Sequence, residues 1–413
     1  MKNTFLSEMN LRGFLNQCTD LEKLEKISSK KPLKGYIGFD ITAPSLHVGS
    51  LMQIMVLRLL QKYGHQPIVL LGGGTTLIGD PSGKDSTRKI LNYKDIKKNI
   101  IGIKKVFEKL LPSNNKKTKP IFVDNYNWLG KLKYIDFLRD VGKHFTINKM
   151  LTFDSVKMRL DREQSLSYME FNYMILQAYD FYQLHKEHNC ILQMGGSDQW
   201  GNIVNGVELI RRISQKEAFG LTTPLITLSS GIKMGKTEKG AVWLNKNMFS
   251  PYDYWQFWRN TADDDVGRFL KFFTDENADE LSDKIENEKN INNLKILLAN
   301  KATTILHGAK AAKESADTAE ETFVKGGLGK NIPEKIISKK IISQGINIID
   351  LIFQNGLVQS KSEARRILNN NGIKINDNVI VDEKKIINMN DVLKNNFIKL
   401  SVGKKNHLKV KII

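Results

Sequence analysis

The sequence is poor in the residues that build disulfide-rich, fibrous or membrane proteins. Its 413 residues include two cysteines, Cys18 and Cys190, too few for a disulfide framework or a four-thiolate zinc site. We therefore expect no protein-bound zinc and a reducing, cytoplasmic compartment. Nine prolines and 30 glycines exclude collagen-like and low-complexity classes. No run approaches the roughly 20 apolar residues of a membrane span, and no signal-peptide block opens the chain, so we expect no membrane partner.

Two common nucleotide-binding motifs are also missing. Residues 72–79 (GGGTTLIG) do not supply G-x-G-x-x-G, because Leu77 stands where the third glycine is needed. Residues 79–84 (GDPSGK) have one spacer too few for a phosphate-binding P-loop, and Asp85 follows where serine or threonine is required. The sequence therefore supports neither a dinucleotide-binding fold nor a P-loop ATPase.

What the chain does contain is the composition of a folded globular protein. Hydrophobic residues make up 41% and charged residues 26%, and the length predicts two or three domains. A net charge of +19 suggests a polyanionic partner such as nucleic acid. Because lysines far outnumber arginines, 51 against 12, an AT-biased coding composition explains the charge equally well. Residues 344–413, with 12 basic and 6 acidic side chains, are more basic than the rest.

Short β-prone runs alternate with amphipathic stretches through the first half. The expected strands are residues 35–39, 67–71, 120–124, 190–194 and 224–227, and a helix is expected over residues 46–63. Strands separated by helices of this length predict an α/β fold with a parallel sheet and helical crossovers. Ligands of such sheets bind beyond the carboxyl ends of the strands, so the residues that follow each strand are the candidates for a site.

The second half is expected to hold two further units. Apolar residues take helical spacing from residue 250 to 321, which predicts a helical bundle, and a Gly- and Lys-rich linker follows over residues 325–340. In the last unit, Ser360 and Glu363 form a capping box that opens a short basic helix. Strand-like alternation follows at residues 372–376, 397–402 and 408–412.

Two segments carry candidates for binding phosphate. His47 lies in a loop that opens a helix, where free backbone N–H groups and the helix dipole attract anions. Lys233 and Lys236 lie three residues apart on a glycine-containing loop, and their ammonium groups can neutralise a leaving pyrophosphate. Taken alone, each has an ordinary alternative, a helix-capping histidine in the first case and a solvated basic loop in the second.

Two further segments carry polar groups in apolar surroundings. Tyr173, Gln177 and Asp180 recur at i, i+4 and i+7 on one face of an otherwise apolar helix, where they either pair within the core or line a polar pocket. Residues 193–202 (QMGGSDQWGN) follow an expected strand. Their glycines allow close backbone approach, and Gln193, Asp198 and Gln199 are directed into the same crevice, unless the segment is merely a tight turn.

Taken in order, these segments resemble the bacterial and organellar tyrosyl-tRNA synthetases, a family of class I aminoacyl-tRNA synthetases. The matching segments are residues 36–40 (YIGFD), 47–50 (HVGS), 79–83 (GDPSG), 141–144 (VGKH), 177–180 (QAYD), 196–202 (GSDQWGN) and 233–237 (KMGKT). The basic C-terminal unit is similar to the S-four-type RNA-binding module, through residues 360–366 and the strands that follow.

The resemblance implies both an architecture and a reaction. The implied parts are a Rossmann-like catalytic domain over residues 1–228, a lysine loop over 229–248, an α-helical anticodon-side domain over 249–324, a linker over 325–343 and a small α+β RNA-binding domain over 344–413. Tyrosine and ATP, brought with Mg²⁺, would form tyrosyl-adenylate and pyrophosphate, and the tyrosyl group would pass to the 3′ end of tRNA(Tyr). No covalent protein nucleophile and no protein metal site are implied, so catalysis would rest on alignment and charge stabilisation.

The family's residue roles carry over by position. Tyr36 and Asp180 would hold the phenolic hydroxyl, Asp80, Tyr173 and Gln177 the amino group, and Gln199 the carboxylate. ATP and the adenylate would meet Gly38, Asp40, His47, Gly49, Gly196, Asp198 and Lys236. His47, Lys233, Lys236 and Thr237 would stabilise the departing pyrophosphate, with Thr42 near the γ-phosphate. Lys361, Arg365 and Arg366 would contact RNA.

One position departs from the family pattern, because Ser50 stands where a second histidine is usual. A serine hydroxyl still donates one hydrogen bond and suits a helix start, so we expect an active enzyme with Ser50 in its catalytic site. The related tryptophanyl enzyme is disfavoured, because Tyr36 and Asp180 fit a phenol. An RNA-binding or splicing factor that has lost activation stays open. The resemblance also implies a symmetric homodimer.

Overall fold

The computed structural model describes residues 4–80, 91–231, 234–237, 240–323, 333–393, 396–403 and 406–413, without the side chains of residues 154, 155, 236 and 237. The chain forms two compact units, Met1–Ala309 and Lys310–Ile413. Within the described ranges, no helix is long and apolar enough to cross a membrane. The expected motif residues 81–83, Lys233 and residues 325–332 of the expected linker lie outside the described residues.

A six-stranded sheet in the order β1-β6-β5-β2-β3-β4 organises the first unit. Its strands are β1 (Gln17–Cys18), β2 (Lys34–Asp40), β3 (Gln66–Gly72), β4 (Ile121–Asp124), β5 (Leu192–Gly196) and β6 (Phe219–Thr223). All neighbours pair in parallel except β1, which is antiparallel to β6. β3 is buried along nearly its whole length, as expected of a central parallel strand with helices on both faces. The α/β expectation is thereby confirmed.

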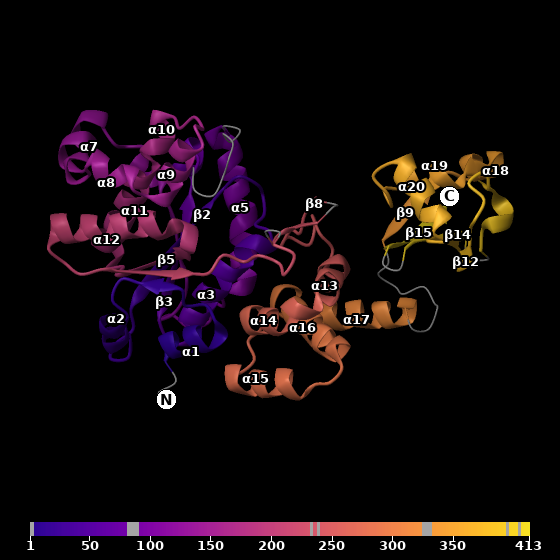
Figure 1. Ribbon diagram of the computed structural model, residues 1–413, viewed down its shortest axis with the longest axis horizontal. Helices are drawn as coiled ribbons and strands as arrows, with labels where there is room; N and C mark the ends of the chain where they lie inside the picture. The colour runs from indigo at the N-terminus through magenta and orange to yellow at the C-terminus, as the bar shows by residue number, and fades with distance from the viewer. Residues whose placement is uncertain are drawn as a thin grey trace. The chain divides into compact units, whose positions relative to one another are not determined.

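The direction of the strand connections fixes where a ligand can enter. The chain passes from β2 to β3 in one direction along the sheet through α3 (Leu51–Lys62), and from β5 to β6 in the other through α12 (Trp200–Ser214). Because such crossovers are right-handed, the two helices lie on opposite faces, and Figure 1 shows α12 above β5 with α3 below it. The strand order therefore reverses between β5 and β2, which is where ligands of doubly wound sheets bind.

Two expected boundaries in this unit are wrong. Residues 224–227 lie beyond β6, and the strand instead occupies Phe219–Thr223, because Pro224 has no N–H to donate to a ladder. The helix expected over residues 46–63 begins as a 3₁₀ turn, η1 (Val48–Ser50), and becomes α-helical only at Leu51. His47, just before this turn, has extended backbone and forms a β-bridge with Trp243, and Val48 donates its N–H to the Val242 carbonyl, so the chain before Val48 pairs with another segment and does not continue the helix.

Further helices fill both faces of the sheet and line its carboxyl edge. They are α1 (Phe5–Arg12), α2 (Leu21–Ser28), α4 (Thr75–Ile78), α5 (Tyr93–Leu110), α6 (Tyr126–Leu129), α7 (Tyr134–Asp140), α8 (Ile147–Leu151), α9 (Asp154–Asp161), α10 (Tyr168–Phe171) and α11 (Tyr173–His188), with 3₁₀ turns η2 (Gly142–His144) and η3 (Ser197–Gln199). Phe181 and Leu184 of α11 are fully buried in a core that also contains Tyr36 and Trp128. This packing brings α11 and its polar face to the end of β2.

Helices without strands follow, as the apolar spacing predicts. They are α13 (Pro251–Arg259), α14 (Asp263–Phe273), α15 (Ala278–Asn287), α16 (Ile291–His307) and α17 (Ala309–Phe323). Ser250 caps α13 by accepting the Asp253 N–H, and Trp258 and Phe273 pack together in the core at 4.8 Å. The buried Arg12 of α1 donates to the Lys271 and Thr274 carbonyls at the C-terminal end of α14, each at 2.8 Å. This contact fastens the helical region to the N-terminal helix of the sheet region.

The second unit contains a five-stranded sheet in the order β12-β11-β14-β15-β9 and a separate β10–β13 ladder. Its elements are β9 (Glu334–Ile337), α18 (Lys339–Gln344), β10 (Ile346–Asn347), α19 (Ile348–Gln354), α20 (Lys361–Asn369), β11 (Ile373–Ile375), β12 (Asn378–Val379), β13 (Ile386–Ile387), η4 (Met389–Asp391), β14 (Phe397–Val402) and β15 (Asn406–Ile412). The three expected strands in this unit are found as β11, β14 and β15. Ile398, Leu400 and Val410 pack with α19 and α20 in one core.

Part of the expected linker is folded. Residues 334–343 form β9 and most of α18, and β9 pairs in parallel with β15. Ile342 of α18 is fully buried in the core, and Ile337 of β9 packs against it, which explains why this lysine-rich stretch is ordered. The expected capping box is half present: Ser360 Oγ accepts the Glu363 N–H at 3.1 Å, but the Glu363 carboxylate accepts from the Gln359 N–H at 2.7 Å.

Candidate active site

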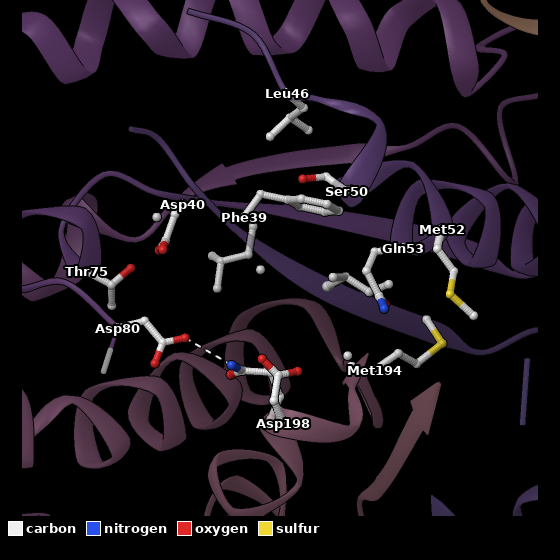
Figure 2. Close-up of a pocket in the computed structure, with 18 of the residues that line it drawn as sticks. Phe39, Asp40, Leu46, Ser50, Met52, Gln53, Thr75, Asp80, Met194 and Asp198 are labelled. Atoms are coloured by element: carbon white, nitrogen blue, oxygen red, sulfur yellow. Dashed lines mark hydrogen bonds between the residues drawn. The ribbon is translucent and has the colours of Figure 1, made fainter. Parts of the chain in front are cut away.

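A cavity of about 420 Å³ opens at the carboxyl ends of β2 and β5, at the point where the strand order reverses. The predicted site residues that line it are Tyr36, Gly38, Asp40, Thr42, His47, Gly49, Ser50, Asp80, Tyr173, Gln177, Asp180, Gly196, Asp198 and Gln199. Figure 2 shows Asp40, Ser50, Asp80 and Asp198 around the same space. Residues from five separate segments are therefore brought to one cleft, although their individual roles stay predictions.

Other predicted site residues are not in this group. Lys233 lies outside the described residues, and the side chains of Lys236 and Thr237 are not described. Lys361, Arg365 and Arg366 lie on α20 of the second unit. There, Lys361 pairs with Asp350 at 2.7 Å and Arg365 with Glu383 at 3.5 Å.

Alternation along β2 explains how its residues reach the cleft. Tyr36, Gly38 and Asp40 are two residues apart, so they share one face of the strand. Gly38 leaves open space, because a Cβ added there would meet only Leu70, at 3.8 Å. A ligand can therefore extend along the strand from the Tyr36 ring to the Asp40 carboxylate.

The deep end of the cleft is built around Asp180 of α11. Its side chain is buried, and desolvation raises the pKa of the carboxyl to about 7, against the opposing effect of hydrogen bonds from Asn125 and Trp128. Tyr36 is also buried, and burial followed by the nearby Asp180 charge raises the pKa of its phenol well above the ordinary value. Tyr36 Oη has no hydrogen-bond partner among the described residues. A buried hydroxyl without a partner is costly, so this position suits a ligand with a polar tip.

Sequence reasoning missed the two residues that hold Asp180 in place. Asn125 Nδ2 donates to Asp180 Oδ2 at 2.9 Å, and Trp128 Nε1 donates to Asp180 Oδ1 at 2.7 Å. Asn125 also accepts the Gly74 N–H at 2.7 Å, which ties β4 to the loop after β3. The available signal was positional, because Asn125 directly follows the expected strand 120–124 at the sheet's carboxyl edge.

A chain of amide hydrogen bonds crosses the middle of the cleft. Gln199 Nε2 donates to Asp80 Oδ2 at 2.9 Å, the bond drawn as a dashed line beside Asp80 in Figure 2. Asn202 Nδ2 donates to Gln199 Oε1 at 3.0 Å and to Gln177 Oε1 at 3.1 Å. This chain links the Asp80 carboxylate to the Gln177 amide, and both line the cleft with oxygens that can accept from a ligand ammonium group.

The His47 loop and the segment around Gly235 are joined by backbone hydrogen bonds. Val48 donates to the Val242 carbonyl at 2.9 Å, and Val242 donates to the Gly235 carbonyl at 3.1 Å. A Cβ on Gly49 would lie 2.7 Å from the His47 ring and 2.9 Å from the Met234 carbonyl, so only glycine allows this approach. The two segments with predicted phosphate-binding residues are therefore neighbours in space.

Ser50 lines the same cleft but does not cap the helix that follows it. It stands at the N-cap position of α3, where its side chain makes no capping hydrogen bond. The hydroxyl is thus not committed to the helix, unlike the Ser360 hydroxyl at the start of α20.

The charges in the cleft separate its possible ligands. The described lining residues include the carboxylates of Asp40, Asp80, Asp180 and Asp198 but no lysine or arginine. This lining favours an ammonium group, whereas a polyphosphate needs cations from elsewhere, such as the lysine loop. Within the described ranges, no group of three or more His, Cys, Asp or Glu side chains could hold a metal ion.

Comparison with known proteins agrees with this arrangement. The family described as "tRNA synthetases class I (W and Y)" matches residues 28–324, and the family described as "Tyrosine--tRNA ligase SYY-like C-terminal domain" matches residues 327–410. A protein named tyrosine–tRNA ligase from Pelagibacter ubique is 62% identical over 413 residues, which is 100% of both chains. This chain belongs to the class I tyrosyl-tRNA synthetase family. A second member, from Rickettsia massiliae, is 52% identical over 99% of this chain and 100% of its own.

Solved structures of the tyrosyl-tRNA synthetase family have the same fold. The C-terminally truncated mitochondrial tyrosyl-tRNA synthetase of Aspergillus nidulans superposes with a TM-score of 0.70 at 30% identity, over 78% of this chain and 95% of that one. The tyrosyl-tRNA synthetase of Archaeoglobus fulgidus, solved with L-tyrosine, reaches 0.56 at 17% identity over 75% of this chain and 99% of its own. At that identity the likeness concerns the fold alone.

Proposed function

We propose that this protein is a tyrosine–tRNA ligase that activates tyrosine with ATP and transfers it to the 3′ end of tRNA(Tyr). The observation that carries the choice of tyrosine is the pair Tyr36 and Asp180 at the closed end of the cleft. One is a buried hydroxyl without a partner among the described residues, and the other is a buried carboxyl fixed by two donors. A phenolic hydroxyl can both donate to Asp180 and accept from Tyr36.

The rest of the amino acid fits the middle of the cleft. Its ammonium group would lie among Asp80, Tyr173 and Gln177, and its carboxylate near Gln199. The Gln199–Asp80 hydrogen bond holds these two side chains beside each other before the ligand enters. Tyrosine would therefore be bound at both ends, with its carboxylate directed toward the His47 end of the cleft.

ATP would occupy the remaining space as its Mg²⁺ complex. Asp40 and Asp198 would contact the adenylate, and the glycines at positions 38, 49 and 196 leave room for it. The tyrosine carboxylate attacks the α-phosphorus, and the bond from that phosphorus to the bridging oxygen breaks to release pyrophosphate. Charge grows on the leaving group, where His47, Lys236, Lys233, Thr237, Thr42 and Ser50 would stabilise it.

The assembly and the RNA contacts are also proposed. Exposed apolar side chains gather on the short helices α7 to α10, including Tyr134, Ile135, Ile147 and Leu160, and such a surface supports a homodimer interface. The basic helix α20, with Arg366 beside Lys361 and Arg365, supports an RNA-binding role for the second unit.

The test is aminoacylation with tyrosine, phenylalanine and tryptophan, using the full chain and a chain that ends after Gly329. We expect tyrosine alone to be charged efficiently and a stable tyrosyl-adenylate to form without tRNA. The shortened chain should still form the adenylate, since the cleft lies wholly in the first unit, but it should charge tRNA more weakly. Preference for tryptophan would identify the chain as the related tryptophanyl enzyme. If no adenylate formed, the chain would instead be a protein that binds RNA without activating an amino acid. Equal charging of tRNA by both chains would show that residues 330–413 make no essential contact with tRNA.

A further inference from the structure

Asp265 lies in the first turn of α14, well separated in sequence from every predicted site residue. Its side chain is 2% exposed, and a buried carboxylate is unfavourable unless several donors compensate it. The donors are Ser229 and, from α14 itself, Arg268. Asp265 Oδ2 accepts the Ser229 N–H at 3.0 Å and the Ser229 Oγ at 3.1 Å, while Arg268 donates to Asp265 Oδ1 at 2.6 Å.

Arg268 completes the contact from the same helix. Its guanidinium also donates to the Thr227 carbonyl at 2.6 Å. Arg268 therefore binds the Thr227 carbonyl, and Asp265 binds the Ser229 N–H. We call this pair of contacts between α14 and residues 227–229 the α14 clamp. An acidic residue at this position would ordinarily serve the dipole of its own helix, but here the carboxylate bonds to another segment.

Short steps connect the α14 clamp to the cleft. Gly231 closes a turn on the Leu228 carbonyl at 2.8 Å, and Met234 returns to the Ile226 carbonyl at 3.4 Å. The Met234 carbonyl lies so close to Gly49 that a Cβ there would approach it to 2.9 Å, and Gly235 would place a Cβ 2.8 Å from His47 Nδ1. The position of residues 227–229 relative to α14 therefore determines how Met234 and Gly235 pack against the His47 loop.

The helix that carries the clamp is itself fixed. Its C-terminal end is held by Arg12, through the Lys271 and Thr274 carbonyls, and its side packs on α3. α3 is the helix that His47 and Ser50 precede. One rigid helix thus supports both sides of the phosphate end of the cleft.

We infer that Asp265 and Arg268 are positioning residues for pyrophosphate departure, because they hold residues 227–229 in the position that lets Met234 and Gly235 contact the His47 loop. This inference rests on the proposed function. Neither side chain lines the cleft, so both act through the described residues 226–231, 234 and 235 and not on the substrate.

The test compares Asp265→Asn with the matched control Asp264→Asn in the full chain. Asp264 lies in the same helical turn and is exposed, so its substitution removes the same charge near the helix start without touching residues 227–229. Three quantities are measured: tyrosine-dependent ATP–pyrophosphate exchange, the dissociation constant of tyrosine alone, and the melting temperature. Exchange by the unmutated chain is measured first, and its absence would overturn both this inference and the proposed function.

We expect Asp265→Asn to lower the kcat of exchange by about 10-fold or more, the usual effect of losing a charge-assisted hydrogen bond. The tyrosine dissociation constant should stay within about 2-fold of that of Asp264→Asn, since the Asp180 end of the cleft is unchanged. Equal kcat for the two variants would overturn the inference, as would a loss of tyrosine affinity equal to the loss of kcat.

Ser229→Ala supplies a second test, because Ser229 is exposed and its substitution is expected to leave folding intact. It removes one of the two hydrogen bonds to Asp265 Oδ2 and should lower kcat by about 5-fold. In a chain that already carries Ser229→Ala, Asp265→Asn should lower kcat by a smaller factor than it does alone, since the two residues share one interaction. Fully additive losses would show that Asp265 does not act through Ser229 and would overturn the positioning role.

Discussion

Trp128 donates its indole N–H to Asp180 Oδ1 at 2.7 Å, from a four-residue helix to a carboxylate 52 positions later in the sequence. Together with Asn125 on the other oxygen, this bond fixes the plane of the carboxylate. Each oxygen retains a lone pair beyond its bond to the protein. The geometry thus presents a carboxylate of fixed orientation to a ligand, with the Tyr36 hydroxyl close by.

Tyr36→Phe and Asp180→Ala are expected to reduce the preference for tyrosine over phenylalanine. When a ring without a hydroxyl enters, the Tyr36 hydroxyl stays without a partner and Asp180 loses the donor that the substrate would supply, and each substitution removes one of those penalties. A neutral hydrogen bond corresponds to about 2- to 10-fold, so Tyr36→Phe should lower the ratio of kcat/KM values by that order, and Asp180→Ala by more. If a variant left the ratio unchanged, the substituted residue would not contact the phenolic hydroxyl.

The pH dependence of stability should contain a component from Asp180. Its folded pKa of about 7 lies above the value of 3.8 expected in the unfolded chain, so the folded protein binds more protons between these values. The free energy of unfolding should accordingly fall as pH rises from about 4 to about 7, and this component should be constant above that range. Asp180→Asn should remove it. Urea unfolding of both chains at pH 5 and pH 8 measures the effect, and an equal difference at the two pH values would contradict it.

Ser50 can be tested in both directions, by Ser50→Ala and by Ser50→His. If its hydroxyl donates to the nucleotide, alanine should lower tyrosine-dependent pyrophosphate exchange by about 10-fold, the value of one hydrogen bond to a charged group. Histidine, the usual residue of the family, should retain or raise the rate. A silent alanine variant would show that Ser50 has no part in activation.

Gly49→Ala should impair activation without affecting tyrosine binding. The added Cβ would lie 2.7 Å from the His47 ring and 2.9 Å from the Met234 carbonyl, so the ring or the backbone must move. Since a small displacement at a reacting centre can cost about 100-fold in rate, we expect a loss of that order in kcat with an unchanged dissociation constant for tyrosine. Gly64→Ala is not a suitable control, because Gly64 has a positive φ of 84°. Gly142→Ala is suitable, because the added Cβ would make ordinary contacts, with Leu138 at 3.4 Å and the Phe137 carbonyl at 3.9 Å. Equal activity of the Gly49 and Gly142 variants would contradict the prediction.

Local sequence signals were sufficient where periodicity and burial agree. β14 occupies the expected residues 397–402, because alternate residues such as Ile398 and Leu400 pack in the core. The strand expected at 224–227 was wrong because its apolar residues follow a proline. The start of α3 was misplaced because Val48 pairs with Val242, and no local pattern reveals a partner so distant in the chain.

The site shows the same limit. Tyr173, Gln177 and Asp180 could be grouped because one helical face joins them, and the structure places all three in the cleft. Asn125 and Asp265 could not be found in this way. Each acts through a residue on another element, and only the fold brings the partners together.

The unpartnered hydroxyl of Tyr36 also affects the resting protein. Without a substrate, this buried polar atom has no hydrogen-bond partner among the described residues, at a cost in folding free energy of about 1–3 kcal/mol. Tyr36→Phe should therefore melt at a higher temperature than the parent chain even as it discriminates less well. The pocket thus gives up some stability for accuracy, and a substrate that binds this atom should stabilise the folded chain as well as react.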